Sequence, residues 1–280
     1  AERIEMQNVP HAALSISMEG CMESGRDAVC GGCKYNSYGG TAPGLATIAD
    51  SLTAIKYMVF DKKICTAQEL YDAVMADWEG YEPLRQRIIN EVPHFGNNEP
   101  YADEEMKWVI DMYVDLCSKV YSTRTSYYKP GLYGAADHVA QGYHAWATPN
   151  GRKTGEPLAD AASPSQGCDK CGPAAIFSSS EVYDNSKFLD GIALNIRLHP
   201  SALSREDGVE KLREMTKTHF ENGGMEAQYN VVSSEVLRAA QEDPDKYKNL
   251  VVRIAGYSAY FVEMNKDLQN DIISRTENMI

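Results

Sequence analysis

The stretch that decides the fold is "NLVVRIAGYSAYFVEMNKDLQNDIISRT", residues 249–276. Its β-branched residues before Gly256 favour a strand, and the spacing of "KDLQNDIISRTE" (266–277) predicts a helix that closes the chain. Gly256 therefore lies in a turn between a strand and a helix. From the residues alone, it is a loop glycine that takes a positive φ, because glycine has no Cβ to oppose that conformation.

Upstream segments extend this pattern. We predict a strand with one buried face at 191–200, a helix at 205–222 ended by Gly223-Gly224, a strand at 226–232 and a helix at 233–244. Nearer the N-terminus we predict helices over 44–63, over 66–78 and over 103–122. Thr66 and Glu69 form a capping-box pattern at the start of the second of these. Residues 127–172 are rich in glycine, proline and small polar residues, which indicates loops. The chain is therefore expected to be α/β.

Composition narrows the class of protein. The 280 residues carry a net charge of -13, which argues against nucleic acid or an anionic membrane as a partner. We found no apolar run of the roughly 20 residues that span a bilayer and no signal-peptide pattern. Seven cysteines, an odd number, fit reduced thiols better than a disulfide framework. These features predict a soluble, cytoplasmic protein.

The sequence around Gly256 carries a resemblance. "RIAGYSAYF" (253–261) matches the pattern R-[VI]-x-G-[YF]-x-x-x-[FW] of the glycyl radical enzymes. Three more blocks agree in order and spacing with that family: "GGMEAQYNVVSSEVL" from Gly223, "ATPNGRKTGEPLADAASPSQG" from Ala147 and "GLATIADSLTAIK" from Gly44. The chain thus resembles glycyl radical enzymes over nearly its whole length, and it is more similar to their non-pyruvate-lyase branch, which contains dehydratases, decarboxylases, C–X lyases and alkylsuccinate synthases.

The resemblance implies a fold and a catalytic residue. It implies the C-terminal half of a ten-stranded α/β barrel over residues 1–146 and a glycyl radical domain over residues 147–280. Gly256 would carry the radical, with Arg253, Tyr257, Ser258 and Phe261 supporting its loop. A glycine Cα radical is stabilised by the flanking amide and carbonyl, and without a side chain the centre can flatten; alanine would add a Cβ to a tight loop.

The resemblance also implies how the radical is made and used. A partner activase with S-adenosylmethionine and a 4Fe-4S cluster removes a hydrogen from the glycine, so the radical is a modification and no cofactor stays bound. The radical then generates a cysteine thiyl, which abstracts hydrogen from a small organic substrate. Such chemistry is anaerobic and oxygen-sensitive, since dioxygen cleaves the backbone at the radical.

Gly20-Cys21-Met22-Glu23 has the letters of the family's thiyl loop, G-C-x-E. However, Cys21 lies too close to the 44–63 helix for that loop. It matches better a second, inert cysteine found in family members before a glycine-rich strand. Leu14, Ile16, Ser17, Met18, Cys21 and Met22 form a helical apolar stripe. We therefore interpret Cys21 as a packed residue, because a free cysteine behaves as a small hydrophobe.

If so, the chain has no thiyl cysteine. We expect it to be the C-terminal portion of a larger polypeptide or one subunit of a split enzyme, in a homo- or hetero-oligomer, whose partner supplies that cysteine. The expected function is a glycyl radical lyase that is incomplete without its upstream half. One alternative is a spare-part protein that docks onto a damaged or incomplete partner and restores its glycyl domain, and another is a structural subunit without a radical.

Other candidate sites have open interpretations. The pairs Cys30/Cys33 and Cys168/Cys171 would suit a metal if they converged, and scattered reduced thiols are the alternative. The charged residues of the 150–160 loop either line a substrate mouth or are solvated: Arg152, Lys153, Glu156 and Asp160. His138 and His144 lie in a glycine-rich region where a substrate could bind. Tyr229 and Asn230 are expected to support the Gly256 loop.

Overall fold

The computed structural model describes residues 2–124, 127–254 and 256–280. The α-helices are α1 (Glu2–Asn8), α2 (Ala12–Ser17), α3 (Cys21–Ser24), α4 (Leu45–Ile55), α5 (Ala67–Met75), α6 (Glu82–Glu91), α7 (Pro100–Lys119), α8 (Asp137–His144), α9 (Pro173–Ser180), α10 (Pro200–Leu203), α11 (Gly208–Glu221), α12 (Ser234–Glu242) and α13 (Lys266–Ser274). A π-helical segment, η2 (Lys56–Asp61), continues α4. Short 3-10 helices are η1 (Ala28–Cys30), η3 (Asn185–Lys187), η4 (Pro244–Tyr247) and η5 (Phe261–Glu263). No described helix combines the length and the apolar character needed to cross a bilayer.

The strands form three small sheets. β1 (Tyr38–Thr41), β2 (Tyr128–Leu132) and β3 (Gly191–Ile192) pair in parallel, in that order. β4 (Asn195–Leu198) and β5 (Gln228–Val231) form a parallel pair. β6 (Val251–Arg253) and β7 (Ser258–Tyr260) form an antiparallel hairpin. Helices and strands alternate along the chain, so the prediction of an α/β fold is confirmed.

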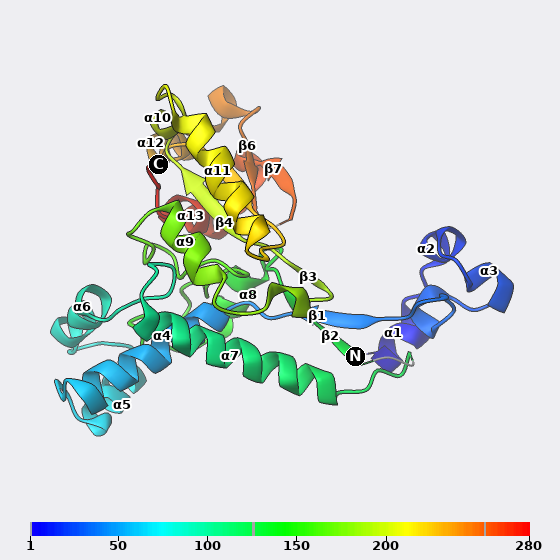
Figure 1. Cartoon of the computed structure of the whole chain (residues 1–280), viewed down its shortest axis with the longest axis horizontal. Helices are drawn as coiled ribbons and strands as arrows, with labels where there is room; N and C mark the ends of the chain where they lie inside the picture. Colours follow the sequence, from blue (N-terminus) through cyan, green and yellow to red (C-terminus); the bar gives the residue numbers. More distant parts are fainter. Residues whose placement is uncertain (1, 125–126, 255) are drawn as a thin grey trace.

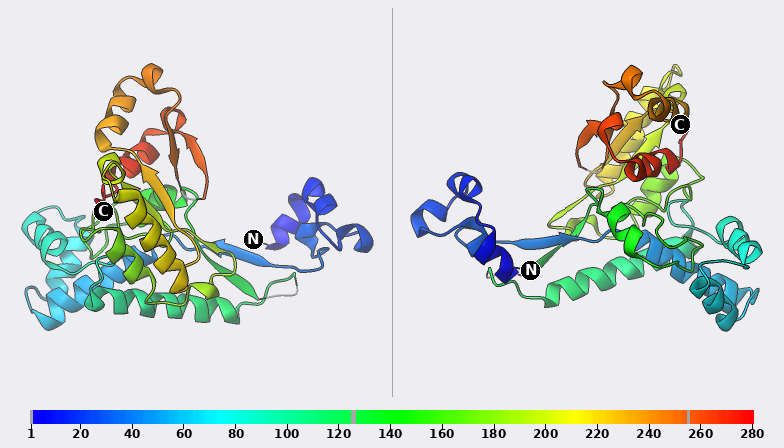
Figure 2. Two further views of the ribbon diagram at one scale, coloured as in Figure 1. Left: turned by 45° about the horizontal axis from the view of Figure 1, so that its top comes forward. Right: turned by 180° about the vertical axis from the view of Figure 1, so that it is seen from behind.

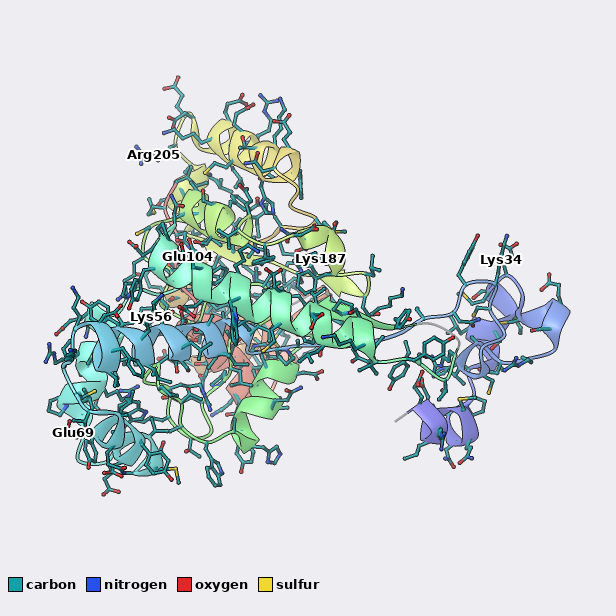
Figure 3. All side chains as sticks on the ribbon, turned by 60° about the horizontal axis from the view of Figure 1, so that its bottom comes forward. Lys34, Lys56, Glu69, Glu104, Lys187 and Arg205 are labelled. Atoms are coloured by element: carbon teal, nitrogen blue, oxygen red, sulfur yellow. The ribbon has the colours of Figure 1, made fainter. Side chains whose placement is uncertain are left out.

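An N-terminal lobe, residues 2–37, stands apart from the rest of the molecule (Figures 1 and 2). It holds α1, α2, α3 and η1, and β1 leads from it into the body. Figure 3 shows Lys34 on this lobe, far along the molecule from Lys56 and Glu69. Glu2 accepts hydrogen bonds from Ser122 and from the backbone N–H of Thr123, which fastens the lobe to the segment after α7.

Two hydrophobic cores matter for the site. The main core packs α4 and α7 against β2, α9 and β4, with Met106, Ile110, Leu132, Ile176 and Ile196 nearly inaccessible to solvent. A smaller core joins α12 and α13 to the β6–β7 hairpin through Leu237, Val252, Phe261 and Ile272. The main core contains side chains from both predicted domains, residues 1–146 and residues 147–280. The domain boundary between residues 146 and 147 stays a prediction.

Several predicted elements need correction. The 127–172 region contains β2 and α8, although Pro130 and Gly131 suggest loop, because parallel pairing with β1 and β3 overrides their low strand propensity. The predicted strand 191–200 is split between two sheets as β3 and β4, and both faces of β4 are buried. Gly256 lies between two strands, because residues 258–260 form β7.

The predicted helices over 44–63, 66–78 and 103–122 are present as α4 with η2, α5 and α7. The capping box of α5 is confirmed, because Thr66 Oγ1 accepts from the Glu69 N–H at 3.1 Å and Glu69 Oε2 accepts from the Thr66 N–H at 2.7 Å. The buried face of α4 is formed largely by small side chains. Ala46, Ala49 and Thr53 are fully buried, whereas Ile48 is 46% exposed.

Candidate functional site

The β6–β7 hairpin presents Gly256 at its tip. The Ile254 N–H donates to the Tyr257 carbonyl at 2.9 Å, which closes the turn. Gly256 has φ +87° and is exposed, and among the described residues other than its chain neighbours no heavy atom lies within 4 Å of the position that a Cβ would occupy. The described structure thus demands glycine here for its backbone conformation and not for lack of space, which corrects the expectation of a crowded loop.

Two side chains of β5 hold this hairpin. Gln228 Oε1 accepts a hydrogen bond from the Gly256 N–H at 3.1 Å and another from Arg253 Nε at 3.1 Å. Asn230 Oδ1 accepts from the Arg253 N–H at 2.7 Å, and its Nδ2 donates to the Arg253 carbonyl at 2.6 Å. Both amides are buried. The backbone on either side of the turn is therefore fixed by a neighbouring strand's side chains.

The four residues expected to support the loop occupy different places. Arg253 also donates to Ser258 Oγ at 3.3 Å, across the base of the turn. Tyr257 contributes its carbonyl, while its side chain is 43% exposed. Phe261 is fully buried in the small core, and its carbonyl accepts from Gln269 Nε2 at 2.9 Å. Arg253 and Ser258 thus flank the turn at the ends of β6 and β7, Tyr257 lies in the turn, and Phe261 lies in the core beneath it.

Arg275 connects the hairpin to the rest of the molecule. Its Nη1 donates to the Ile254 carbonyl at 3.3 Å, two residues before Gly256. Its Nη2 lies 2.9 Å from Asp160 Oδ2 and 3.0 Å from Asp271 Oδ2. Asp160 accepts a further bond from Asn195 Nδ2 at 3.0 Å. One nearly buried guanidinium therefore joins the glycine turn, α13 and the loop before α9.

Asp271 lies at the centre of this network. Its carboxylate also contacts His138 Nε2 at 3.0 Å and accepts from Gln166 Nε2 at 2.8 Å. Burial alone would raise the pKa of Asp271, but Arg275 and His138 outweigh it and hold this pKa well below its usual value. The group stays ionised, so the network keeps its charge contacts over the ordinary pH range.

A cavity of about 700 Å³ lies beside the network. Its wall is formed by α8, α13 and the loops around residues 150–157 and 165–170, with Arg152, Gln166, Cys168, Asp271 and Ser274 among the lining side chains. Polar groups make up much of this wall, and Gly256 is not part of it. The cavity could hold a small polar molecule on the side of α13 that faces the loops.

Two of the four charged residues of the 150–160 loop, Arg152 and Glu156, line this cavity, whereas Lys153 and Asp160 do not. Arg152 is buried and donates to the Trp146 and Glu156 carbonyls, so it braces the loop from within. Burial lowers the pKa of Arg152. Lys153 is partly exposed, and its Nζ lies 3.7 Å from a carboxylate oxygen of Glu82. Asp160, in contrast, is buried and contacts Arg275. The four residues that the sequence groups together therefore have separate structural tasks.

The two histidines also separate. His138 is fully buried and bound to Asp271, which makes it a structural partner and not a substrate ligand in this structure. His144 ends α8, exposed, with its ring 5.2 Å from that of Tyr143. Tyr229 likewise differs from the expectation: its hydroxyl lies 2.6 Å from Thr216 Oγ1 on α11, whereas Asn230 does support the hairpin.

Cys21 begins α3 in the N-terminal lobe and is 3% exposed, as a packed cysteine should be. Its Sγ lies 3.7 Å from Cys33 Sγ. The continuous apolar stripe predicted around it is wrong, because α2 ends at Ser17 and Ile16 and Met22 are 72% and 69% exposed. These apolar side chains are left without cover within the described chain.

The two C-x-x-C pairs do not meet. Cys30 and Cys33 lie in the N-terminal lobe, and Cys168 and Cys171 lie in the body, in the loop before α9 (Figure 1). Within residues 2–124, 127–254 and 256–280, the one group of three potential metal ligands is Asp50, His94 and Cys168. Asp50 and Cys168 outweigh the effect of burial and raise the pKa of His94 to about 11.

Sequence reasoning missed Gln228, Asp271 and Arg275. Gln228 lies two residues before Asn230, so period two places both on one face of β5. Asn230 and its position in the strand therefore point to Gln228. The carboxylate partners of Arg275 are Asp160, 115 residues away in sequence, and Asp271 on the preceding helix α13, and neither pairing has a local signature.

The pyruvate formate lyase-like family model matches residues 1–142, and the glycine radical family model matches residues 158–262. The (2S)-3-sulfopropanediol dehydratase of Klebsiella oxytoca is 38% identical over 98% of this chain and 33% of its own length. The isethionate sulfite-lyase of Desulfovibrio desulfuricans is 42% identical over 84% of this chain and 28% of its own.

A solved structure, the glycerol-bound B12-independent glycerol dehydratase from Clostridium butyricum, superimposes with a TM-score of 0.92 at 36% identity. The match covers 100% of this chain and 35% of that one. The chain spans about a third of the length of the curated relatives it matches. Its α/β arrangement therefore corresponds to a part of a larger barrel.

Proposed function

The chain belongs to the pyruvate formate lyase-like glycyl radical enzymes, and on that premise we propose that it is the C-terminal catalytic portion of a glycyl radical lyase. Gly256 stores the radical. The observation that carries the proposal is the β6–β7 turn, in which a glycine inside the family's motif is exposed at φ +87° with its N–H held by Gln228. An activating enzyme can reach a glycine in that position.

We further propose that the thiyl cysteine comes from polypeptide outside these 280 residues. Cys21 is a free cysteine buried in the N-terminal lobe, with its Sγ 3.7 Å from that of Cys33. The lobe exposes Leu14, Ile16 and Met22, and clustered exposed apolar side chains mark a surface that another chain covers. Among the described strands β1 lies at an edge of its sheet, and an edge strand can pair with a further strand.

The proposed reaction is a radical elimination from a small hydroxylated molecule. The similar proteins are named for the loss of water from sulfopropanediol and glycerol and for the release of sulfite from isethionate. The thiyl takes one hydrogen atom from the substrate, which leaves a thiol and a carbon radical. That radical loses either hydroxide or sulfite, and in each case also a proton, so that water or hydrogen sulfite is released. The product radical then takes the hydrogen atom back from the thiol, which restores the thiyl.

A partner activase of the S-adenosylmethionine and 4Fe-4S type installs the radical in this proposal, and the enzyme works without oxygen in the cytoplasm. The glycyl radical is then the cofactor, carried on the chain as a modification. The Arg275 network holds the base of the turn while the tip stays accessible, since its contact to the hairpin is at Ile254 and not at Gly256.

The test is reconstitution. The 280-residue chain is activated anaerobically and combined with an upstream polypeptide that carries a G-C-x-E loop. The measurement is the amount of dehydrated product or of sulfite that is formed from a hydroxylated substrate. Turnover should need both polypeptides and should vanish when the upstream cysteine is replaced by alanine. Turnover by the 280-residue chain alone would contradict the proposal, and a Cys21→Ser variant would then show whether Cys21 is the thiyl.

A further inference from the structure

Asp50, His94 and Cys168 come together from three distant segments. Asp50 lies on α4, His94 follows α6, and Cys168 lies in the loop before α9. One carboxylate oxygen, one imidazole nitrogen and the thiol sulfur all lie within 4.8 Å of one another. Asp50 and His94 are buried and Cys168 is half-buried. An oxygen, a nitrogen and a sulfur ligand are thus gathered at one point.

The imidazole points an unpartnered atom into this group. His94 is 5% exposed, and its Nδ1 has no hydrogen-bond partner within the described residues. The nearest Asp50 oxygen is 3.8 Å away, which is too long for a hydrogen bond. The other ring nitrogen, Nε2, lies 3.3 Å from the Ile89 carbonyl and donates to it. This contact orients the ring and directs Nδ1 toward the carboxylate and the thiol.

The carboxylate of Asp50 has one charged partner, and that partner is His94. Asp50 is completely buried, and its oxygens accept from the Phe95 N–H at 2.9 Å and from Ser165 Oγ at 2.6 Å. In the described part of the chain its one ion-pair contact is to His94 Nδ1, at 3.8 Å. Burying a carboxylate is costly, and a bound divalent cation would offset that cost more fully than a single imidazolium at this distance.

We propose that Asp50, His94 and Cys168 bind a zinc-class divalent cation. Tetrahedral zinc takes oxygen, nitrogen and sulfur ligands at about 2.0–2.3 Å, which sets its ligand atoms about 3.3–3.8 Å apart. The His94–Asp50 distance already meets this spacing, and the other two distances, which are within 4.8 Å, need a shift of at most about 1 Å. The thiolate favours zinc over magnesium or calcium. Binding releases the thiol and imidazolium protons.

The site would fasten the loop before α9 to α4. Ser165, three residues before Cys168, already binds Asp50, while Gln166 in the same loop binds Asp271 of the glycine-loop network. Ser165 and Cys168 also line the 700 Å³ cavity, so the ligand group lies beside a space that solvent reaches. Neither Cys171 nor the Cys30/Cys33 pair takes part.

The experiment uses the reduced, chelator-treated 280-residue chain, titrated anaerobically with Co²⁺ as a spectroscopic probe. One Co²⁺ should bind per chain with a thiolate-to-cobalt absorption band, and one equivalent of Zn²⁺ should displace it. Cys168→Ser should abolish the band, and His94→Ala should weaken affinity at least tenfold. Cys171→Ser is the matched control from the same C-x-x-C pair, and it should leave the absorption band and the Co²⁺ affinity unchanged.

X-ray absorption on the unsubstituted Zn²⁺ protein makes the test independent of variant folding. One sulfur with nitrogen and oxygen ligands is the expected shell. Two or more sulfurs would overturn the proposal, because Cys168 is its sole thiolate. So would the absence of Co²⁺ binding, or a charge-transfer band that survives in a Cys168→Ser variant with the native circular dichroism spectrum.

Discussion

The side-chain oxygen of Gln228 accepts the backbone N–H of Gly256 at 3.1 Å, and the same oxygen accepts from Arg253 Nε at 3.1 Å. A single buried amide on β5 thus holds both the radical glycine's own peptide and the arginine three residues before it. Gly256 and Tyr257 are exposed, so this contact restrains the tip of the turn together with the bond from the Ile254 N–H to the Tyr257 carbonyl.

Replacing Gln228 with alanine should loosen the turn. Loss of the acceptor removes two hydrogen bonds, which costs about 1–2 kcal/mol and corresponds to about a 5- to 30-fold increase in local opening. Hydrogen exchange at the Gly256 amide, followed by NMR, should accelerate by that factor. Gln68→Ala is the control, since Gln68 is exposed on α5 and bonds only Asp72. Equal protection in both variants would show that Gln228 does not restrain the turn.

Replacing Arg275 with alanine should destabilise the protein strongly. The change leaves Asp160 and Asp271 buried without their shared counter-charge, and removing one partner of a buried ion pair costs about 3–5 kcal/mol. Urea unfolding measures the difference. The control is Arg213→Ala, because Arg213 makes exposed pairs with Glu210 and Glu214, and exposed pairs add little to stability. Similar midpoints for the two variants would contradict the network's role.

The acid side of the stability profile should depend on Asp271. Its pKa is lower in the folded protein than in the unfolded chain, because Arg275 and His138 outweigh burial. The stabilisation is therefore present above the unfolded pKa of about 4 and is lost as the pH falls below it. In Asp271→Asn, the decline in unfolding free energy between about pH 5 and pH 2 should be shallower. Parallel profiles for the variant and the parent would be inconsistent with a depressed pKa.

The sequence predicted α4, α5, α7, α11, α12 and α13, the α/β class and the position of the glycine turn, because these depend on local periodicity and on one specific motif. It missed the helices α6, α8 and α9 and the strands β2 and β7. Pro130 lies in the middle strand of its sheet, where local preference opposes a strand and only the partners β1 and β3 enforce it. β7 is three residues long and mostly exposed, so it has no apolar pattern to detect.

The candidate site was predicted only in part, because some of its contacts follow from the local strand pattern and others join segments distant in sequence. Asn230 was expected to support the turn, and it does, but its neighbour Tyr229 faces α11 because adjacent residues of a strand point to opposite faces. The face shared by Gln228 and Asn230 follows from that alternation. By contrast, the meeting of Asp160 with Arg275 depends on how α13 packs against a loop far away in sequence, and no local pattern encodes it.

The central claim is that Gly256 carries the radical. Gly256→Ala should keep the fold, because space for the methyl group is open and the cost is about 1 kcal/mol of backbone strain at positive φ. Gly223→Ala is a matched control, since Gly223 has φ +99° and open space as well. The backbone strain in Gly223→Ala should be similar to that in Gly256→Ala, but Gly223→Ala should leave radical formation unchanged.

The most direct measurement is electron paramagnetic resonance after anaerobic activation with a radical S-adenosylmethionine activase. The parent chain and Gly223→Ala should both give a doublet from the one remaining Cα hydrogen, and deuterated glycine should collapse it to a single line. Gly256→Ala should give no such signal. A doublet of unchanged intensity in Gly256→Ala would contradict the account, as would a folded, activated parent chain that gives none.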